Sequence, residues 1–252
     1  MDDPALLALA AGLAEQAGAA IMDVRARGFA VERKEDFSPV TEADRAAEAV
    51  IVAGLRAATP DIGVIAEEEV SAGHVAAATS TCWLVDPLDG TREFADGKDE
   101  FVVNIGLVRD GAMALGAVYL PALGELFTGI VGVGAWKRDG TGTHAIRTRT
   151  PPDAGLTVVA SRVHGDTERL QRFLAGRPVA RTINFGSALK FCRLAEGAAD
   201  LYPRFGRTME WDTAAPQAVL EAAGGRVVTI DGAPLRYAKP GWENPHFICW
   251  GR

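Results

Sequence analysis

The spacing of apolar residues near the start of the chain predicts two amphipathic helices. In the first, apolar side chains recur at helical spacing at Leu6, Leu9, Leu13, Ala17 and Ile21. We expect this helix to run from Asp3-Pro4, with Asp3 as its N-cap, to about Arg27-Gly28. A second helix is expected to begin at Thr41, where Asp44 stands in the position of a capping-box acid, and to end at Pro60-Asp61.

The middle of the chain has the pattern of strands. Residues 62–66 and 82–85 are short apolar runs, and the second of them ends at Asp86. Three further runs follow between about residue 101 and residue 136, separated by turn residues, at 102–108, 113–119 and 125–131. Short strands joined by tight turns favour an antiparallel meander.

Strand-like and helix-like segments alternate in the last hundred residues, which indicates α/β organisation. The predicted strands are 157–161, 180–184 and 199–203, and the predicted helices are 166–174, 187–196 and 212–223. Residues 148–155, which include Pro151-Pro152, are the best candidate for a linker. We therefore divide the chain into an N-terminal α+β half, residues 1–147, and a C-terminal α/β half, residues 156–252.

Composition narrows the possible classes of function. Hydrophobic residues make up 48% of the 252 residues, so a sizeable core is expected. A net charge of -7 argues against nucleic-acid polymers as partners, because their phosphates require a surplus of Lys and Arg. The three cysteines are widely spaced, so neither a disulfide framework nor a zinc site is indicated. The first residues are acidic, unlike those of a signal peptide. No uninterrupted apolar run of about 18 residues occurs, as a membrane span would need. We expect a cytoplasmic protein without a membrane span, and leave open peripheral membrane association and the choice between monomer and homodimer.

Acidic residues stand where predicted strands end or helices begin, namely Glu67, Asp86, Asp89 and Asp212. Taken singly, each is more simply interpreted as an exposed residue or a helix cap, and Asp212 in particular suits a cap. The pair Asp86 and Asp89 is harder to explain in this way, because it directly follows an apolar strand. Mg²⁺ takes oxygen ligands and binds through a few carboxylates, waters and substrate phosphate. The group therefore predicts a magnesium-dependent phosphate site.

The turn that contains this pair suits such a site in detail. Pro87 stiffens it, so that both carboxylates can aim at one small volume. Leu88 can pack its side chain while its carbonyl turns to a metal ion. Gly90-Thr91 then opens a predicted helix, whose first N–H groups favour an oxyanion, and glycine lets a phosphate approach closely.

Other kinds of catalytic site have weaker support in the sequence. The four histidines lack the HxxxH or HxH spacing of a zinc site. Gly132-Val133-Gly134 lacks the third glycine of a dinucleotide fingerprint, and there is no P-loop. The serines lack the GxSxG context of a hydrolase nucleophile. Without a nucleophile, hydrolysis by activated water is the mechanism that fits.

Three segments resemble the metal-binding motifs of the inositol monophosphatase superfamily: Ala66-Glu67-Glu68, Asp86-Pro87-Leu88-Asp89-Gly90-Thr91 and Trp211-Asp212-Thr213-Ala214-Ala215. Their order and spacing agree, and the resemblance extends over nearly the whole chain. It implies a layered αβαβα fold that combines α+β and α/β parts. It also implies lithium-sensitive, Mg²⁺-dependent hydrolysis of phosphate monoesters, with about two or three Mg²⁺ ions in each active site.

Four further segments are similar to one bacterial branch of that superfamily, the CysQ 3'(2'),5'-bisphosphate nucleotidases. These segments are residues 38–44, 91–94, 186–192 and 199–205. Enzymes of this branch remove the 3'-phosphate of adenosine 3',5'-bisphosphate, a by-product of sulfate assimilation, and release AMP and phosphate. The resemblance implies the same small-molecule substrate here.

The resemblance also implies a role for each matching residue. Asp86 would bridge two metals, Glu67 and the Leu88 carbonyl would complete the first metal site, and Asp89 with Asp212 would complete the second. Asp44 would pair with the Thr91 hydroxyl and, together with Glu67, help to deprotonate the attacking water. The residues implied to contact substrate are Glu67, Leu88, Asp89, Gly90, Thr91, Ser187, Lys190, Arg204 and Asp212.

The choice of substrate depends on the C-terminal half. Inositol monophosphatases tend to place a Glu seven residues before the aspartate of the Trp-Asp motif, and here Phe205 occupies that position. Losing a hydroxyl acceptor argues against inositol, while Lys190 and Arg204 suit the second phosphate of a bisphosphate. An inositol-1-phosphate or other sugar-phosphate phosphatase remains the alternative. A silent binding protein is disfavoured, because no metal ligand is missing.

Overall fold

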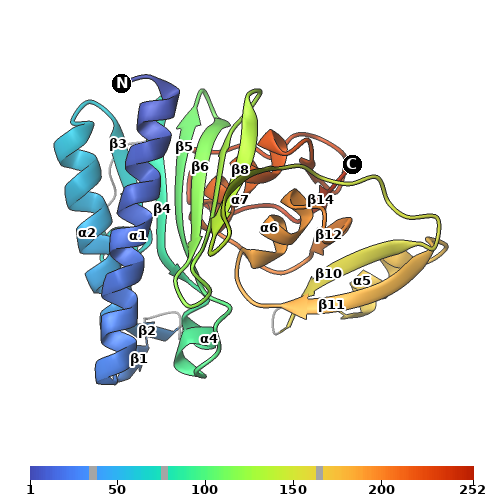
Figure 1. The fold of residues 1–252 in the computed structure, drawn as a ribbon, viewed down its shortest axis with the longest axis horizontal. Helices are drawn as coiled ribbons and strands as arrows, with labels where there is room; N and C mark the ends of the chain where they lie inside the picture. The colour runs from blue at the N-terminus through green and yellow to red at the C-terminus, as the bar shows by residue number, and fades with distance from the viewer. Residues whose placement is uncertain (34–38, 75–78, 163–166) are drawn as a thin grey trace.

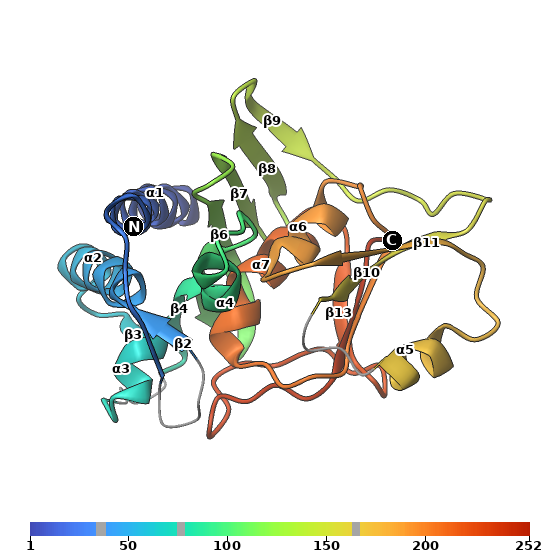
Figure 2. The same ribbon diagram turned by 90° about the horizontal axis from the view of Figure 1, so that it is seen from below.

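Helices and sheets alternate in five layers in this computed structural model, which describes residues 1–33, 39–74, 79–162 and 167–252 (Figures 1 and 2). Helices α1 (Asp3–Arg27) and α2 (Glu42–Ala58) cover one face of a seven-stranded sheet. Helices α6 (Leu189–Ala195) and α7 (Glu210–Ala222) lie between that sheet and a five-stranded one, and α5 (Thr167–Leu174) lies outside the second sheet. The expected layered αβαβα fold is confirmed.

The seven-stranded sheet follows chain order from β3 to β9. Its strands are β3 (Gly63–Ala66), β4 (Thr81–Asp89), β5 (Val102–Arg109), β6 (Ala112–Leu120), β7 (Glu125–Ile130), β8 (Gly134–Asp139) and β9 (Gly142–Ile146). Only β3 and β4 pair in parallel, and every other neighbouring pair is antiparallel. The predicted meander is present and continues through β8 and β9, which the apolar pattern did not indicate because β9 is largely exposed.

The five-stranded sheet has the order β11-β10-β12-β14-β13. Its strands are β10 (Leu156–Ser161), β11 (Val179–Phe185), β12 (Leu201–Arg204), β13 (Arg226–Thr229) and β14 (Phe247–Trp250). Strand β10 pairs in parallel with β11 and β12, as expected of an α/β unit, whereas β14 runs antiparallel to both β12 and β13. The last two strands follow the final predicted helix and were not anticipated.

The predicted helices exist, with small differences at their ends. The N-cap of α1 is Asp2 rather than Asp3, and its side chain accepts the Ala5 N–H at 3.0 Å. The Asp3 carboxylate is instead bound to Arg109 on β5. Helix α2 has the capping box expected of Thr41 and Asp44. Helix α7 begins two residues before Asp212, and α6 begins two residues after Ser187.

The remaining elements are short. They are β1 (Val31–Arg33), β2 (Pro39–Thr41), α3 (Glu67–Ser71) and α4 (Thr91–Ala95). Two expectations fall partly outside the described residues: the motif beginning at Ser38 and a helix start at Asp166. The division of the chain at residues 148–155 stays a prediction.

Helix α1 is long and apolar enough, by length and composition, to pass as a membrane span, although no uninterrupted apolar run was found in the sequence. Its residues Leu6, Ala10, Leu13, Ala17 and Ile21 are buried in the core formed with α2 and the seven-stranded sheet. The core helix of a folded domain passes the same test, and this packing accounts for the apolar composition of α1.

Helix α7 lies unusually close to the seven-stranded sheet, because three adjacent strands present glycine beneath it. A Cβ atom on Gly106 of β5 would come within 2.7 Å of the Ala215 nitrogen, and one on Gly129 of β7 within 2.8 Å of the Val219 Cα. On β6 between them, Gly116 lies against Ala215 in the same way. Side chains at these positions would hold the helix away from the sheet.

Candidate active site

The parallel pairing of β3 and β4 brings the first two acidic residues together. In this register Ala66 lies beside Val85, so the next residues lie side by side: Glu67 directly after β3, and Asp86 within β4, which continues past the strand end expected at Asp86. Carboxyl ends of adjacent parallel strands are a common place for a site, since the side chains that follow them converge. Glu67 begins α3, and Asp86 is buried at 2% exposure.

An irregularity in β4 between Asp86 and Asp89 turns the second carboxylate toward the same space. The Leu88 N–H donates to Asp86 Oδ1 at 3.0 Å, which fixes the turn. The Leu88 side chain is fully buried in the core beneath α1 and α2, as expected, while its carbonyl remains on the side of Thr91. At this bend the Leu88 side chain packs in the core, while its carbonyl oxygen is available for polar contacts.

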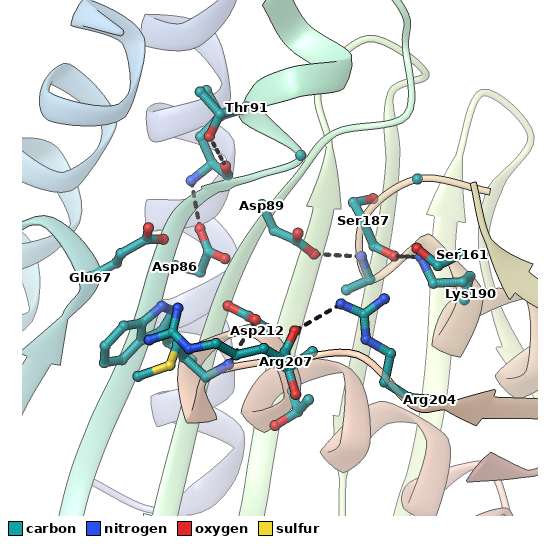
Figure 3. Close-up of a pocket in the computed structure, with 18 of the residues that line it drawn as sticks. Glu67, Asp86, Asp89, Thr91, Ser161, Ser187, Lys190, Arg204, Arg207 and Asp212 are labelled. Atoms are coloured by element: carbon teal, nitrogen blue, oxygen red, sulfur yellow. Dashed lines mark hydrogen bonds between the residues drawn. The ribbon is translucent and has the colours of Figure 1, made fainter. Parts of the chain in front are cut away.

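Asp89 and Asp212 are oriented by backbone donors from the C-terminal part of the chain. The Ala188 N–H donates to Asp89 Oδ2, and the Met209 N–H donates to Asp212 Oδ2 at 2.9 Å. Figure 3 shows the carboxylates of Glu67, Asp86, Asp89 and Asp212 around one space. We call these four residues the acidic wall. They line a cavity of about 780 Å³, a size suited to a small ligand.

The acidic residues disturb one another's ionisation. Burial raises the pKa of Asp86 well above its ordinary value, and the neighbouring carboxylates of Glu67, Asp89 and Asp212 raise it further. The pKa of Asp212 rises to about 8 by burial and by the charges of Asp89 and Glu67. Burial raises the pKa of Asp89 to about 6, against the effect of Lys190. Buried like charges of this kind are stabilised by a cation between them.

The donor set fits Mg²⁺ rather than a softer metal, since it consists of oxygens. Among the described residues, no three acidic, histidine or cysteine side chains form a closed metal cage. Mg²⁺ does not require one, because it usually keeps several waters and uses phosphate oxygens. Asn104 gives a second indication: it lies across from Asp86 on β5, is fully buried, and has no hydrogen-bond partner for either amide atom within the described residues. An orphaned amide beside the carboxylates suits a site completed by water or an ion.

Thr91 connects the cavity to Asp44 on α2. Its hydroxyl lies 3.0 Å from Asp44 Oδ1 and 3.1 Å from the Leu88 carbonyl oxygen, and its single proton can serve only one of them. Asp44 Oδ2 accepts from the N–H of Thr41 at 2.7 Å and from the Thr41 hydroxyl at 2.8 Å. Asp44 therefore lies behind Thr91 and holds its hydroxyl toward the acidic wall, as the sequence analysis expected of this pair.

Gly90 has a backbone conformation that other residues rarely adopt. Its φ of 97° places it in the left-handed region, directly before α4. A Cβ atom there would meet the Glu100 carbonyl oxygen at 3.0 Å and Ser187 Cβ at 3.3 Å. Glycine therefore permits both the turn and the close approach of the loop that carries Ser187.

The opposite side of the cavity is formed by Ser187, Lys190 and Arg204, which we call the basic wall. Lys190 is buried, and its ammonium donates to the carbonyls of Phe185 and Ser187. Burial lowers its pKa to about 8. Arg204 Nη2 donates to the Arg207 carbonyl at 2.9 Å, while its buried Nε has no partner within the described residues. Arg204 thus has a buried donor that is available to a ligand.

Two residues near the Trp-Asp motif do not line the cavity. Phe205, at the position of the inositol-binding Glu, packs edge-on to Phe173 and His246. Glu210 is fully buried and accepts the N–H groups of Ala238 and Lys239 at 2.7 Å and 3.0 Å. Its carboxylate holds a turn, so it does not replace the missing acid.

Asn104 and Glu48 were not identified from the sequence, because their contacts depend on strand register and on helix packing. The spacing of four residues between Asp44 and Glu48 was the one available signal.

Comparison with known proteins agrees with this geometry. The sequence model of the inositol monophosphatase family matches residues 2–246. A protein of Escherichia coli O157:H7 named 3'(2'),5'-bisphosphate nucleotidase CysQ is 45% identical over 240 residues, which cover 93% of this chain and 95% of that protein. Its counterpart in Buchnera aphidicola, with the same name, is 40% identical over 90% of this chain and 85% of its own length.

A solved structure has the same architecture. The crystal structure of CysQ from Bacteroides thetaiotaomicron, described as a bacterial member of the inositol monophosphatase family, superposes with a TM-score of 0.82 at 36% identity. The alignment covers 98% of this chain and 97% of that one. With the family match over almost its whole length, the chain belongs to the inositol monophosphatase family.

Proposed function

We propose that this chain is a Mg²⁺-dependent 3'(2'),5'-bisphosphate nucleotidase that removes the 3'-phosphate of adenosine 3',5'-bisphosphate to give AMP and phosphate. The observation that carries the proposal is the pairing of the two walls: four mutually repelling carboxylates face a cavity whose other side holds the buried guanidinium of Arg204. The acidic wall suits metal ions bound to one phosphate of the substrate, and the side that holds Arg204 suits its second phosphate. The names of the similar nucleotidases support the same substrate.

The acidic wall would hold about two or three Mg²⁺ ions. Asp86 would be the central metal ligand, because the charges of Glu67, Asp89 and Asp212 all act on its buried carboxylate. The Leu88 carbonyl is the remaining oxygen ligand of the proposed set. When bound, Mg²⁺ supplies charge stabilisation at the phosphoryl oxygens and lowers the pKa of a coordinated water.

The protein's own groups orient the reacting atoms. If the Leu88 carbonyl faces a metal, the Thr91 proton points to Asp44 Oδ1, and the oxygen lone pairs of Thr91 face the cavity. Thr91 Oγ1 could then accept a proton from the attacking water as it passes its own proton to Asp44 Oδ1, with Glu67 as a second acceptor. The backbone N–H groups after Gly90 are placed to bind the scissile phosphate.

Arg204 is the residue proposed to recognise the second phosphate. Its Nε is buried without a partner in the described part of the chain, and guanidinium groups bind phosphate through paired donors. Ser187, the residue of the basic wall that lies close to Gly90, is proposed to contact the nucleotide. Lys190 would contribute its positive charge from behind the loop.

The test is kcat/KM for adenosine 3',5'-bisphosphate beside inositol 1-phosphate, measured in Mg²⁺ and again after chelation with EDTA. We expect the bisphosphate to be preferred by well over tenfold, because an unpaired buried guanidinium penalises a substrate without the second phosphate. Activity should be lost with EDTA and return with Mg²⁺. A preference for inositol 1-phosphate would replace the proposed substrate with the alternative, and full activity in EDTA would exclude the metal mechanism.

A further inference from the structure

A buried acid outside the cavity supports the helix that carries Glu67. Glu48 of α2 is only 6% exposed, and its two carboxylate oxygens accept from the N–H groups of Glu68 at 2.7 Å and Glu69 at 2.9 Å. Helix α3 begins at Glu67, and its own N-cap residue, Ala66, has no side chain that could accept these donors. The first turn of α3 is therefore capped by a residue of another helix.

The capping position is electrostatically unfavourable. The first turn of α3 contains three acidic residues, Glu67, Glu68 and Glu69, and the charges of Glu68 and Glu69 oppose ionisation of Glu48. A neutral acceptor would cap the same donors with less repulsion. A carboxylate, however, offers two acceptors in a rigid fork, which matches two successive backbone N–H groups. This geometry favours a role for Glu48 in orientation over one in stability alone.

Helix α2 carries Glu48 on the same face as Asp44. Glu48 follows Asp44 by four residues, so the two side chains project from the same face, one turn apart. Asp44 holds the Thr91 hydroxyl, and Glu48 holds the helix that begins with Glu67. A single rigid helix thus sets the positions of two groups that come from different strands.

We propose that Glu48 is a positioning residue for the metal site: its carboxylate fixes the first turn of α3 and, with it, the direction in which Glu67 enters the cavity. This inference rests on the proposed function, in which Glu67 is a metal ligand. Residues that orient metal ligands without touching the metal affect metal affinity by about 10- to 100-fold when they are replaced.

The test measures metal binding directly, with Mn²⁺ as the probe and the full chain as the sample. Electron paramagnetic resonance of free Mn²⁺ gives the dissociation constant without any need for turnover. We expect Glu48→Gln, which keeps one acceptor, to weaken Mn²⁺ binding about tenfold, and Glu48→Ala, which keeps none, to weaken it further. The Mg²⁺ concentration for half-maximal hydrolysis should rise by the same factors, while kcat of Glu48→Gln at saturating Mg²⁺ stays within about twofold of wild type.

Glu42→Gln is the matched control, because it removes the same charge from the same helix. Glu42 is exposed and pairs loosely with Arg27 at 3.4 Å. Its variant should bind Mn²⁺ as the wild type does. If Glu48→Gln folds, melts at a lower temperature and yet binds Mn²⁺ with unchanged affinity, Glu48 is only a structural cap and the inference is wrong. A wild-type chain that binds no Mn²⁺ would overturn the proposed function together with it.

Discussion

The acidic wall and the basic wall border the same cavity but compensate their charges differently. Asp86 and Asp212 on the acidic wall face other carboxylates, and their pKa values rise because of burial and because of these neighbouring charges. Lys190 on the basic wall is compensated within the chain, by two backbone carbonyls. The acidic wall therefore suits an added cation, whereas on the basic wall the buried Arg204 Nε, which has no partner within the described residues, can serve in selection.

The largest expected effect comes from removing one charge of the acidic wall. Asp89→Asn retains an oxygen that can accept the Ala188 N–H, so the fold should persist. It loses a metal ligand, and we expect kcat to fall by at least about a hundredfold. Steady-state hydrolysis in Mg²⁺ and thermal melting would measure the two properties. Asp96→Asn, in an exposed pair with Lys98, is the control. Retained activity of Asp89→Asn would remove Asp89 from the metal site.

A change on the basic wall should affect one substrate only. Arg204→Lys keeps the charge but loses the forked donors. We expect its KM for adenosine 3',5'-bisphosphate to rise about tenfold, with little change for adenosine 3'-monophosphate, which lacks the second phosphate. Comparing the kinetics with these two substrates isolates the contribution of the second phosphate to binding. Equal increases for both substrates would show that Arg204 supports the cavity without selecting the substrate.

Lys190→Met tests whether the basic wall is complete in itself. The variant leaves the carbonyls of Phe185 and Ser187 without their donor, which costs about 1–3 kcal/mol of stability. We expect a lower melting temperature and equal losses of kcat/KM for the bisphosphate and the monophosphate. If the loss is selective for the bisphosphate, the ammonium contacts substrate, as the sequence resemblance alone suggests, and the contrast between Lys190 and Arg204 fails.

The smallest expected effect is at the point where the two walls meet. Gly90→Ala places a Cβ atom near the Glu100 carbonyl and Ser187, in a left-handed backbone conformation, and should destabilise the fold by about 1–2 kcal/mol. Gly97→Ala is matched, because Gly97 has a φ of 74° and open space around it. Denaturant unfolding compares the two. Activity should fall in Gly90→Ala alone; an equal fall in both variants would mean that contact between the walls is unimportant.

The residues of the acidic wall could be proposed from the sequence because they adjoin regular elements. An apolar run ending in Asp-Pro-Leu-Asp-Gly indicates a strand end with two carboxylates on local grounds. Strand β9 was missed because it is almost wholly exposed, and β8 because one of its two buried residues is Lys137, which an apolar pattern does not record. Asn104 gave no signal, since its place beside Asp86 follows from the register between β4 and β5. The hydrogen bonds from Lys190 to the carbonyls of Phe185 and Ser187 also depend on a turn that residue spacing alone does not reveal.

The glycines beneath α7 give the active site a support that contains no functional group. Gly106, Gly116 and Gly129 set how deeply the helix rests on the sheet, and Asp212 stands in its first turn. The distance between Asp212 and the carboxylates of β4 therefore depends on how closely α7 packs on the sheet. The absence of side chains at these three positions sets that closeness. Adding a methyl group at these positions could change the spacing of the acidic residues without altering any of those residues.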